Sequence, residues 1–594
     1  DCAGSQECVA GVCLEAAEAT VWRTDGGAGI DGGTSIGPDG GAGDAGAAGD
    51  ETGGKPDAPI PTYDSGTASG LDGAGAGDVP LGGQTDAPTA IGDVPQVPDL
   101  QPIDWGPAGS DASITVTAVA EPTSARPGEE IAITVAGAGV ADPKNLTLGG
   151  LLADKVTISE ATSVSFKAKL SVPHGLAPAI VDLGFSCRGG QATASAVLQV
   201  TPIAVSIEGD DTNRGTPDNP FRTVTKAVQT AGVGDTIQVG SGEFVEGETW
   251  PELPHKVTLV GAGVSSTFFN VTGSSCTRIS FVGDAVVRDV ALTGRMCGFS
   301  IAKPQTTVYL EDVAKPKVEC DPCTNEAYNS SLYVDSRATG AQVTIAGSQT
   351  WLPRDVIVRA TNVALVLRDG MIDEVYAPVT GLDLRVEGAT MGNVLEARSI
   401  HTVISLTGAA NVVLDRATLN GEMAVESGST VRAKDTSFKA STGEIGLTTW
   451  YVITSGRDVL RGSANGRLTA TLTNCTFDGG GTQLQVAKDD DVVLRGCKFL
   501  NYERTGLYLI GEPAKLDLGT ATDLGGNEFT GSTASGVYGY QDDRAAAGQT
   551  VTISGTKFNG VTPPAGLLTK SATETACQVG AYCIKTDGNS ITFF

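Results

Sequence analysis

Residues 470–477 read A-T-L-T-N-C-T-F, and residues 492–499, which begin 22 positions later, read V-V-L-R-G-C-K-F. In each stretch, two apolar residues are separated by one residue. Two further residues follow, then a small residue, and the last apolar residue stands two positions after the small one. Alternation with a period of two is typical of a β-strand. The doubled interval marks a sharp turn that shifts the phase by one residue. Each stretch therefore predicts a strand, a turn and a second strand.

The same pattern recurs over the C-terminal two-thirds of the chain, and successive copies begin mostly 19 to 39 residues apart. A unit repeated at such a period is typical of a solenoid, in which each coil stacks on its neighbours. The spacing does not fit an α-helical repeat. We therefore predict an all-β fold in which residues 204–594 form a parallel β-helix. Further copies begin at Val257, Ala285, Leu365, Leu384, Val412, Val431 and Val551.

Two longer motifs carry a family resemblance. Asp210–Phe244 reads D-D-T-N-R-G-T-P-D-N-P-F-R-T-V-T-K-A-V-Q-T-A-G-V-G-D-T-I-Q-V-G-S-G-E-F, and Leu516–Gly531 reads L-D-L-G-T-A-T-D-L-G-G-N-E-F-T-G. Both resemble the pectate-lyase-like β-helix family of unknown function found in bacterial surface proteins. The resemblance implies a right-handed helix, a short capping α-helix near residues 223–231 and a first strand at 236–239. It does not imply an activity.

Three further regions precede the β-helix. Residues 1–20 form a Cys-rich knob, similar to those that follow the leader of bacterial surface lipoproteins, so a lipid anchor upstream of residue 1 is a hypothesis. Residues 21–109 are rich in Gly, Asp and Pro and predict a disordered acidic linker. Residues 110–203 alternate apolar and polar between Pro/Gly turns, which predicts a small β-sandwich. That segment resembles the immunoglobulin-like IPT/TIG domain.

Composition indicates an exported protein. The formal net charge is −29, which argues against nucleic acid or anionic lipid as a partner. No apolar run approaches the roughly 20 residues of a membrane helix. Twelve cysteines, with no histidine beside the closely spaced ones, favour disulfides in an oxidising compartment over zinc. We expect an extracellular or outer cell-surface location.

Cysteine spacing suggests several disulfides. Cys475 and Cys497 occupy the same place in adjacent copies, so stacking would bring their Cα atoms within the roughly 4.4–6.8 Å that a disulfide accepts. We favour a disulfide between the two coils, a coil-to-coil clip, over a stack of two reduced thiols. The same reasoning pairs Cys276 with Cys297, which lie 21 positions apart. The remaining candidates are Cys320 and Cys323, and Cys577 and Cys583.

The function favoured by the sequence is a non-catalytic binding or structural module, directed at polysaccharide or cell-surface glycan and without a cofactor. Extended sugars stack on aromatic side chains. The insertion at residues 443–466 interrupts the repeat and carries two of the aromatic residues. The candidates for stacking are Trp450, Tyr451, Tyr502 and Tyr508.

A calcium-dependent polyuronate lyase is the alternative function. Such an enzyme needs Arg or Lys as the base and carboxylates that hold calcium. Charged residues do alternate between coils, although opposite charges on neighbouring coils would also simply pair. The three histidines (174, 255 and 401) have no nucleophile beside them in sequence. The charged set is Arg385, Glu387, Glu396, Arg398, Asp415, Arg416, Glu422, Glu426, Arg432 and Asp435.

Overall fold

The computed structural model divides the chain into two compact units, residues 1–108 and 109–594. It describes residues 6–9, 12–15, 114–188, 190–273, 277–315, 330–352, 355–392, 402–425, 428–439, 453–455, 468–479, 482–486, 489–509, 515–531, 537–542, 550–563, 566–569, 575–578, 582–586 and 590–593. In the first unit this covers a hairpin of β1 (Gln6–Val9) and β2 (Val12–Glu15), where Cys8 lies opposite Cys13. The predicted linker lies outside the described residues.

The second unit begins with a β-sandwich of a four-stranded and a five-stranded antiparallel sheet, the latter with one parallel edge pair. In β5 (Glu130–Gly137) buried and exposed residues alternate, as the sequence predicts for a strand with one face on a core. Phe166 and Phe185 meet edge to face in that core, with ring centroids 5.1 Å apart. The other strands are β3 (Val116–Glu121), β4 (Ser124–Ala125), β6 (Lys144–Leu148), β7 (Leu151–Leu152), β8 (Asp154–Ser159), β9 (Ser165–Ser171), β10 (Ile180–Cys187) and β11 (Gly190–Val200).

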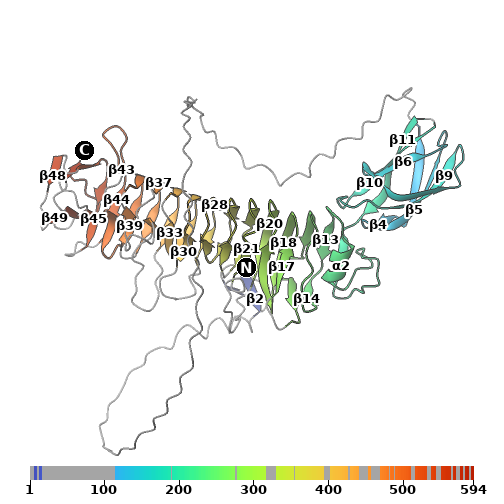
Figure 1. The fold of residues 1–594 in the computed structure, drawn as a ribbon, viewed down its shortest axis with the longest axis horizontal. Coiled ribbons are helices and arrows are strands. Elements are labelled where there is room, and N and C mark those ends of the chain that lie inside the picture. The colour runs from blue at the N-terminus through green and yellow to red at the C-terminus, as the bar shows by residue number, and fades with distance from the viewer. Residues whose placement is uncertain are drawn as a thin grey trace, which may run out of the picture. The chain divides into compact units, whose positions relative to one another are not determined.

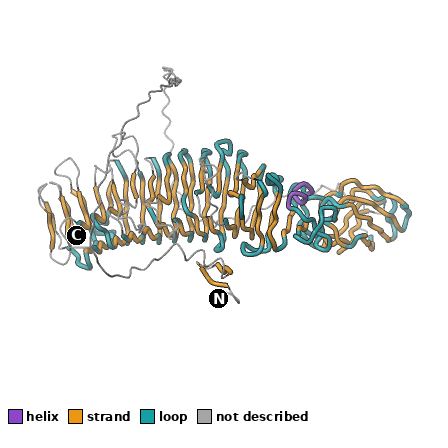
Figure 2. The backbone as a smooth tube through the Cα atoms, turned by 90° about the horizontal axis from the view of Figure 1, so that it is seen from below, coloured by secondary structure: helices purple, strands orange, loops and turns teal. Residues whose placement is uncertain are grey.

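The rest of the second unit is a parallel β-helix, so the predicted fold class is confirmed (Figures 1 and 2). Each regular coil contributes a long strand, a short strand after a turn, and a third strand. We call the rows that these strands form the first, second and third faces. The first and second faces belong to one 24-stranded sheet, and the third face is the 13-stranded sheet.

Strands of the first face pair in parallel from coil to coil. They are β12 (Ile203–Val205), β13 (Thr236–Val239), β15 (Val257–Val260), β18 (Ala285–Leu292), β20 (Thr307–Ala314), β22 (Gln342–Ala346), β25 (Ala364–Arg368), β28 (Leu382–Glu387), β31 (Ala410–Asp415), β34 (Thr430–Lys434), β37 (Thr469–Thr473), β40 (Asp491–Arg495) and β43 (Lys515–Asp517). The second face holds β14 (Gly242–Glu246), β16 (Thr267–Val271), β23 (Trp351–Leu352), β26 (Met371–Ile372), β29 (Thr390–Met391), β32 (Thr418–Asn420), β35 (Ser437–Lys439), β38 (Thr476–Asp478), β41 (Lys498–Leu500), β44 (Glu528–Thr530) and β47 (Lys557–Phe558).

The third face ends in an antiparallel pair, in which Cys577 lies opposite Cys583. Its strands are β17 (Thr277–Phe281), β19 (Met296–Ile301), β21 (Leu332–Val334), β24 (Val356–Val358), β27 (Val375–Ala377), β30 (Thr402–Leu406), β33 (Glu422–Val425), β36 (Ile453–Ser455), β39 (Thr482–Val486), β42 (Thr505–Leu509), β45 (Tyr538–Asp542), β49 (Thr575–Gln578) and β50 (Tyr582–Thr586). A separate three-stranded sheet contains β46 (Thr550–Ile553), β48 (Gly566–Thr569) and β51 (Ser590–Phe593).

A left-handed residue makes the turn between the first and second faces. Asp435 and Asn474 have φ of 50° and 53° there, a conformation that short polar side chains and glycine tolerate best. Asp435 N donates to Thr473 O of the next coil at 3.0 Å, so the backbone ladder continues through the turn. This residue is the origin of the phase shift in the sequence pattern. The same conformation recurs at Asp289, Asp312, Asp369, Gly388, Arg416 and Gly496.

Inward-facing side chains stack on their counterparts in the coils before and after. Phe477 is fully buried, with its ring centroid 4.8 Å from that of Phe438 and 4.7 Å from that of Phe499. The stack continues through Phe529 to Phe558, with neighbouring rings tilted by 12° or less. The coil spacing places these rings face to face.

The helix α2 (Val224–Thr230) covers the first coil, as the family resemblance implies. Its residues Val224, Ala227 and Val228 are buried. The hydroxyl of Thr223 accepts from Lys226 N at 3.1 Å and caps the N-terminus. The following strand is β13, at the residues expected for the first strand.

A buried carboxylate joins the sandwich to the β-helix. Asp235, just before β13, is inaccessible to solvent, and its Oδ2 lies 2.6 Å from His174 Nδ1 of the sandwich. Asp235 Oδ1 accepts from Gly175 N at 2.8 Å, and Oδ2 also accepts from Gly232 N at 2.8 Å. His174 is therefore a junction residue, and its hydrogen-bonded partner is an aspartate rather than a nucleophile.

The clip predicted between Cys475 and Cys497 is wrong, because both are free, buried thiols. In-register parallel strands hold Cβ atoms about as far apart as Cα atoms, at ~4.8 Å. A disulfide needs Cβ atoms roughly 3.5–4.5 Å apart. The thiols instead lie near backbone carbonyls, with Cys497 Sγ 3.3 Å from Leu472 O.

The other proposed disulfides have different outcomes. Cys297 is disulfide-bonded, while Cys276, the partner expected from the sequence, lies outside the described residues. Cys320 and Cys323 also lie outside them. Cys577 and Cys583 are register partners, so their disulfide stays a prediction.

Replacing Phe477 with alanine should remove about 3–5 kcal/mol from the free energy of unfolding, because the cavity would open inside the stack. Chemical denaturation of the full chain measures this loss. Thr469→Ala, at an exposed position in the same coil, is the control and should change stability by less than about 0.5 kcal/mol. Equal effects of the two substitutions would contradict the importance of the stack.

Alkylation should separate the cysteines by state. The hydrogen bond with Cys497 and burial raise the pKa of the Cys475 thiol, and both cysteines are inaccessible to solvent, so neither thiol should react with iodoacetamide in the native protein. Both should react after denaturation without reductant, whereas Cys297 should require reductant. Peptide mass spectrometry reads out each site. If Cys475 and Cys497 were blocked in unreduced, denatured protein, they would be oxidised.

Candidate functional site

The third face is partly covered even where its residues point outward. Ile357 and Gln485 are register partners of Tyr376 and Tyr508, yet they are only 2% and 5% exposed. Ser405 is also buried in the same outward row. The third face therefore does not offer a continuous open platform.

Tyr502, predicted to stack on a glycan, is a core residue. Its side chain is 5% exposed, and burial raises its pKa to about 12. A Cβ built on Gly531 would lie 2.4 Å from the Tyr502 ring, so the ring packs directly on that glycine's backbone. The stacking assignment is wrong because Tyr502 follows β41 at a corner where the chain directs the side chain inward.

The other predicted aromatic residues are not brought together with Tyr502. Tyr508 faces outward on β42 and is half-buried. Its role in stacking stays a prediction. Trp450 and Tyr451 lie outside the described residues.

The charged residues of the lyase hypothesis are spread over different parts of the coil. Arg385, Asp415 and Arg432 point outward on the first face, whereas Glu422 belongs to the third face. Arg416 and Asp435 occupy the left-handed turn, and Glu387 is on the first face. Residues 396, 398 and 426 lie outside the described part.

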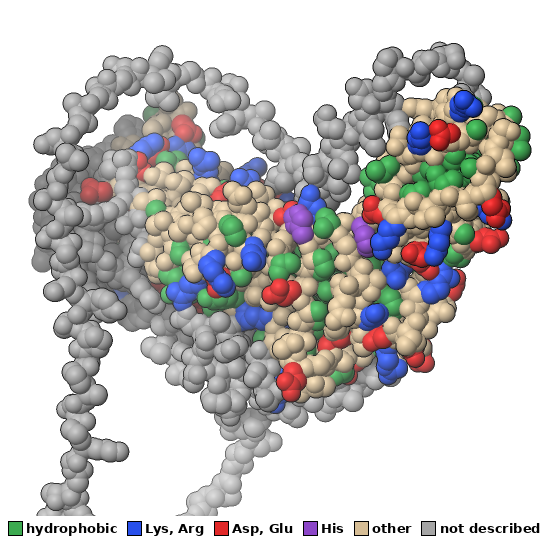
Figure 3. Space-filling model, turned by 45° about the vertical axis from the view of Figure 1, so that its right-hand side comes forward, with side chains coloured by type: hydrophobic (Ala, Val, Ile, Leu, Met, Phe, Trp, Pro, Cys, Tyr) green, Lys and Arg blue, Asp and Glu red, His purple; other side chains and the backbone are tan. Residues whose placement is uncertain are grey.

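Most arginines on and beside the first face are neutralised by a carboxylate nearby. Such pairs satisfy charge on a lateral surface and contribute little to stability. Positive and negative side chains also lie interspersed over the surface drawn in Figure 3. The pairs are Arg288–Glu311 at 3.7 Å, Arg368–Glu387 at 3.0 Å, Arg385–Asp383 at 3.4 Å and Arg416–Asp415 at 3.1 Å.

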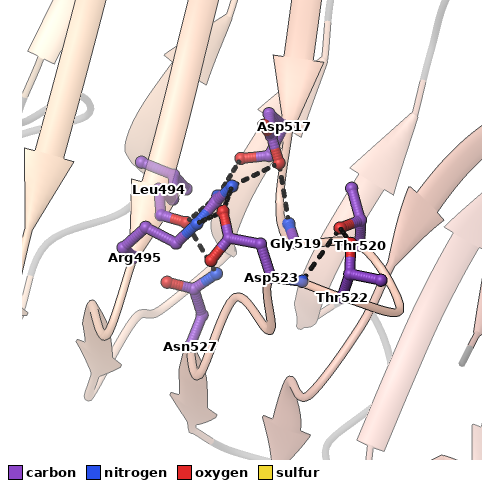
Figure 4. Close-up of polar contacts among 8 residues, drawn as sticks. All are labelled: Leu494, Arg495, Asp517, Gly519, Thr520, Thr522, Asp523 and Asn527. Carbon is purple, nitrogen blue, oxygen red and sulfur yellow. Dashed lines mark hydrogen bonds and ion pairs between the residues drawn. The ribbon is translucent and has the colours of Figure 1, made fainter.

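Arg495 organises the second family-like motif (Figure 4). Its Nη2 lies 2.9 Å from Asp517 Oδ1 and 2.6 Å from Asp523 Oδ2. Asp517 Oδ1 also accepts from Gly519 N at 3.0 Å, and these interactions lower the pKa of the Asp517 carboxyl, mainly through the hydrogen bond from Arg495. Gly519 has φ of 109° and approaches Gly525 too closely for a side chain.

The motif L-D-L-G-T-A-T-D-L-G-G-N therefore holds a loop in place. Its two aspartates bind one arginine, and Asn527 Oδ1 accepts from Cys497 N of the preceding coil at 3.0 Å. Arg495 is not among the residues predicted from the sequence. The available signal was its position directly before Gly496, the turn glycine in the copy of the repeat that precedes this motif.

The described part of the first face contains a shallow depression of about 370 Å³. It spans three successive coils and has both charged and hydroxyl-bearing walls. Arg432 and Lys434 are exposed, and neither has an ion pair or a side-chain hydrogen bond in the described part of the chain. The lining residues are Val413, Leu414 and Asp415 of β31, Arg432, Ala433 and Lys434 of β34, and Thr471 and Thr473 of β37.

The described ranges contain neither a metal-binding cluster nor a membrane-spanning helix. No group of three His, Cys, Asp or Glu side chains there could hold a metal ion. Among the helices described, none has the length and apolar character needed to cross a bilayer. His255 Nδ1 accepts from Asp284 N at 3.1 Å, and His401 lies outside the described residues.

Comparison with known proteins leaves the activity open. A family model described as "Protein of unknown function (DUF1565)" matches residues 207–352, which include the first motif. No curated protein matches the sequence. A rhamnogalacturonan lyase structure is 9% identical with a TM-score of 0.22, covering 57% of this chain and 75% of that one. The catalytic domain of a GH87 α-1,3-glucanase in complex with nigerose is 10% identical with a TM-score of 0.23, covering 82% and 96%. These scores are too low to support an inference about function.

Replacing Arg495 with glutamine should loosen the loop at residues 518–526 by about 1 kcal/mol, a modest effect because Asp523 is mostly exposed. Hydrogen exchange at Gly519 N should become faster. Arg385→Gln, which breaks an exposed pair, is the control and should leave that amide unchanged.

The same substitution should alter the acid sensitivity of the loop. Because the folded pKa of Asp517 is lowered, its stabilising contribution is complete above the ordinary aspartate pKa of about 3.9. That contribution disappears as the pH falls through the folded pKa. Arg495→Gln should reduce this acid-dependent loss, because only the hydrogen bond from Gly519 N and the charge of Lys515 would still lower the pKa of Asp517, and an unchanged pH profile would contradict the role of Arg495.

Proposed function

We propose that this chain is an exported cell-surface β-helix protein that binds an extended glycan on the first face without catalysing a reaction. The observation that carries this proposal is the depression across β31, β34 and β37. It is open to solvent along the face. Its lining is mostly the aliphatic part of side chains from three coils, which stack at a spacing of about 4.8 Å.

The chemistry of the depression suits a sugar chain. Thr471 and Thr473 offer hydroxyl groups that can donate and accept, and Val413 offers an apolar contact for the face of a sugar ring. A second outward row, two residues earlier on the same three strands, consists of Asn411, Thr430 and Thr469. A polymer lying across successive coils would meet an outward side chain of each row at every coil, about 4.8 Å apart.

A binding role accounts for the surface charges more simply than a lyase does. Arg385 is paired with Asp383, and Asp415 with Arg416. A lyase would need a base and calcium ligands directed at one uronate, whereas these residues are distributed over a face and a turn. The lyase remains the alternative, and calcium would be its cofactor.

Export and surface location are part of the proposal. The acidic composition, the twelve cysteines and the disulfide at Cys297 favour an oxidising compartment outside the cytoplasm. The Gly- and Pro-rich residues 21–109 would act as a spacer, and a lipid anchor upstream of residue 1 would tether it.

Glycan binding is tested with the full chain on a glycan array and with acidic polysaccharides, with and without calcium. We expect retention of glycans and no rise in the absorbance of unsaturated uronate ends. Thr471→Ala/Thr473→Ala should weaken retention several-fold, since two hydroxyl partners are lost. Thr390→Ala/Thr418→Ala, outward on the second face, is the matched control and should bind normally.

A calcium-dependent rise in absorbance would replace this proposal with the lyase. Equal retention by both double variants would place the glycan site away from the first face. Retention of no glycan by the folded protein would contradict the proposed function.

A further inference from the structure

We infer that the first-face depression selects a glycan carrying isolated anionic substituents, carboxylate or sulfate, which bind at Arg432 with support from Lys434. This inference rests on the proposed function and names the class of its ligand.

Arg432 differs from most arginines of the first face in having no charged partner. Its register neighbours are Val413 on one side and Thr471 on the other, both uncharged. Arg288, Arg368, Arg385 and Arg495, by contrast, each pair with a carboxylate (Arg385 with Asp383 on its own strand). An exposed guanidinium beside a hollow is thus available to an incoming anion.

The carboxylates next to the depression are already engaged. Asp415 is the register neighbour of Lys434, but its Oδ2 lies 3.1 Å from Arg416 Nε. Asp435 accepts from Asn474 Nδ2 at 3.1 Å. Asp415 lines the depression, but its charge is offset by Arg416, so Arg432 and Lys434 contribute the available positive charge.

Spacing on β34 allows both cations to serve one ligand. Residues two apart on a strand point to the same side and lie roughly 6.6 Å apart. Arginine grips carboxylate or sulfate oxygens in a bidentate manner, and a lysine ammonium adds a flexible point charge. Thr471 and Thr473 lie directly beside them, within reach of the neighbouring sugar hydroxyls.

The charge of the whole protein limits how dense the ligand charge can be. With a formal net charge of −29, the chain repels a polymer that is anionic at every sugar. A local pair of cations acts over about one Debye length of ~8–10 Å. The favoured ligand is therefore a hydroxyl-rich chain with acidic groups separated by neutral sugars.

The inference is tested by titrating immobilised full-length protein with three related polymers. Chondroitin carries one carboxylate per disaccharide, carboxyl-reduced chondroitin is neutral, and chondroitin sulfate adds a sulfate. Arg432→Gln/Lys434→Gln is compared with Lys439→Gln/Lys498→Gln, which removes the same charge from exposed positions on the second face. Circular dichroism confirms that each variant is folded.

We expect the Arg432→Gln/Lys434→Gln variant to lose about tenfold or more in affinity for the anionic polymers, as expected for losing charged hydrogen bonds. Its residual affinity should equal that of the wild type for the neutral polymer. The second-face variant should bind like the wild type. Arg432→Lys should recover part of the loss, because charge returns without the bidentate fork. Chondroitin sulfate, which is anionic at every sugar, should bind more weakly than chondroitin, and tighter binding would contradict the preference for separated acidic groups.

Three results would overturn the inference. Equal binding of neutral and anionic polymers, unaffected by Arg432→Gln/Lys434→Gln, would leave the proposed glycan site intact and remove its charge selectivity. Binding of none of the three polymers by the folded wild type would overturn the inference and count against the proposed function. Equal losses in both double variants would show a non-specific effect of net charge.

Discussion

In-register pairing between parallel coils is the constraint on which the rest of this structure depends. Each backbone group bonds to its counterpart one coil away, so residues at equivalent positions lie about 4.8 Å apart. Like side chains are then forced together. Phe477 lies between two other phenylalanines, and Cys475 lies beside Cys497. The same rule extends through the left-handed turn, where a backbone amide of one coil reaches a carbonyl of the next.

On the outer surface of the β-helix, the same register decides which charged side chains are neighbours. A charged residue on a lateral face has its nearest neighbours one coil away or two positions along its own strand. The described structure meets this condition with pairs such as Arg368–Glu387, and with the Arg495 cluster where a loop must be held. Arg432 is an exception to the pattern, because its register neighbours are uncharged and neither Thr430 nor Lys434, two positions away on its own strand, is a carboxylate. A cation left without a partner on such a regular surface is the feature that most needs a functional explanation.

The fold could be predicted from the sequence because inward positions obey a strict period of two. That period, with one doubled interval, located the strands of the first and second faces, and the family-like motif located α2 and β13. Corners do not obey it. Tyr502 follows a strand at a corner, so its burial could not be deduced from alternation. The predicted disulfide between Cys475 and Cys497 is wrong for another reason, because in-register strands bring the Cα atoms, but not the Cβ atoms, within the range of a disulfide.

The candidate site was harder to predict because it depends on what is missing around a residue. The sequence placed Arg432 among many charged residues, and nothing in the alternation distinguished it from Arg385. The register reveals that Val413 and Thr471 flank Arg432, and the side-chain contacts reveal that Arg385 pairs with Asp383 on its own strand. Arg495 was missed for the converse reason, since its partners Asp517 and Asp523 come from a later motif.

The geometry of a lateral face also bears on the choice between binding and catalysis. Catalytic groups must converge on one reacting atom, within hydrogen-bonding distance of it. Side chains on a flat sheet project side by side, and each meets a different part of the ligand. Such a surface suits recognition of a repeating polymer, because the protein repeat and the ligand repeat are read in parallel. Catalysis on this scaffold would require acidic or basic groups of neighbouring coils to converge on one reacting atom. The residues that line the depression come from three successive strands of one face, which is the arrangement expected of a binding surface.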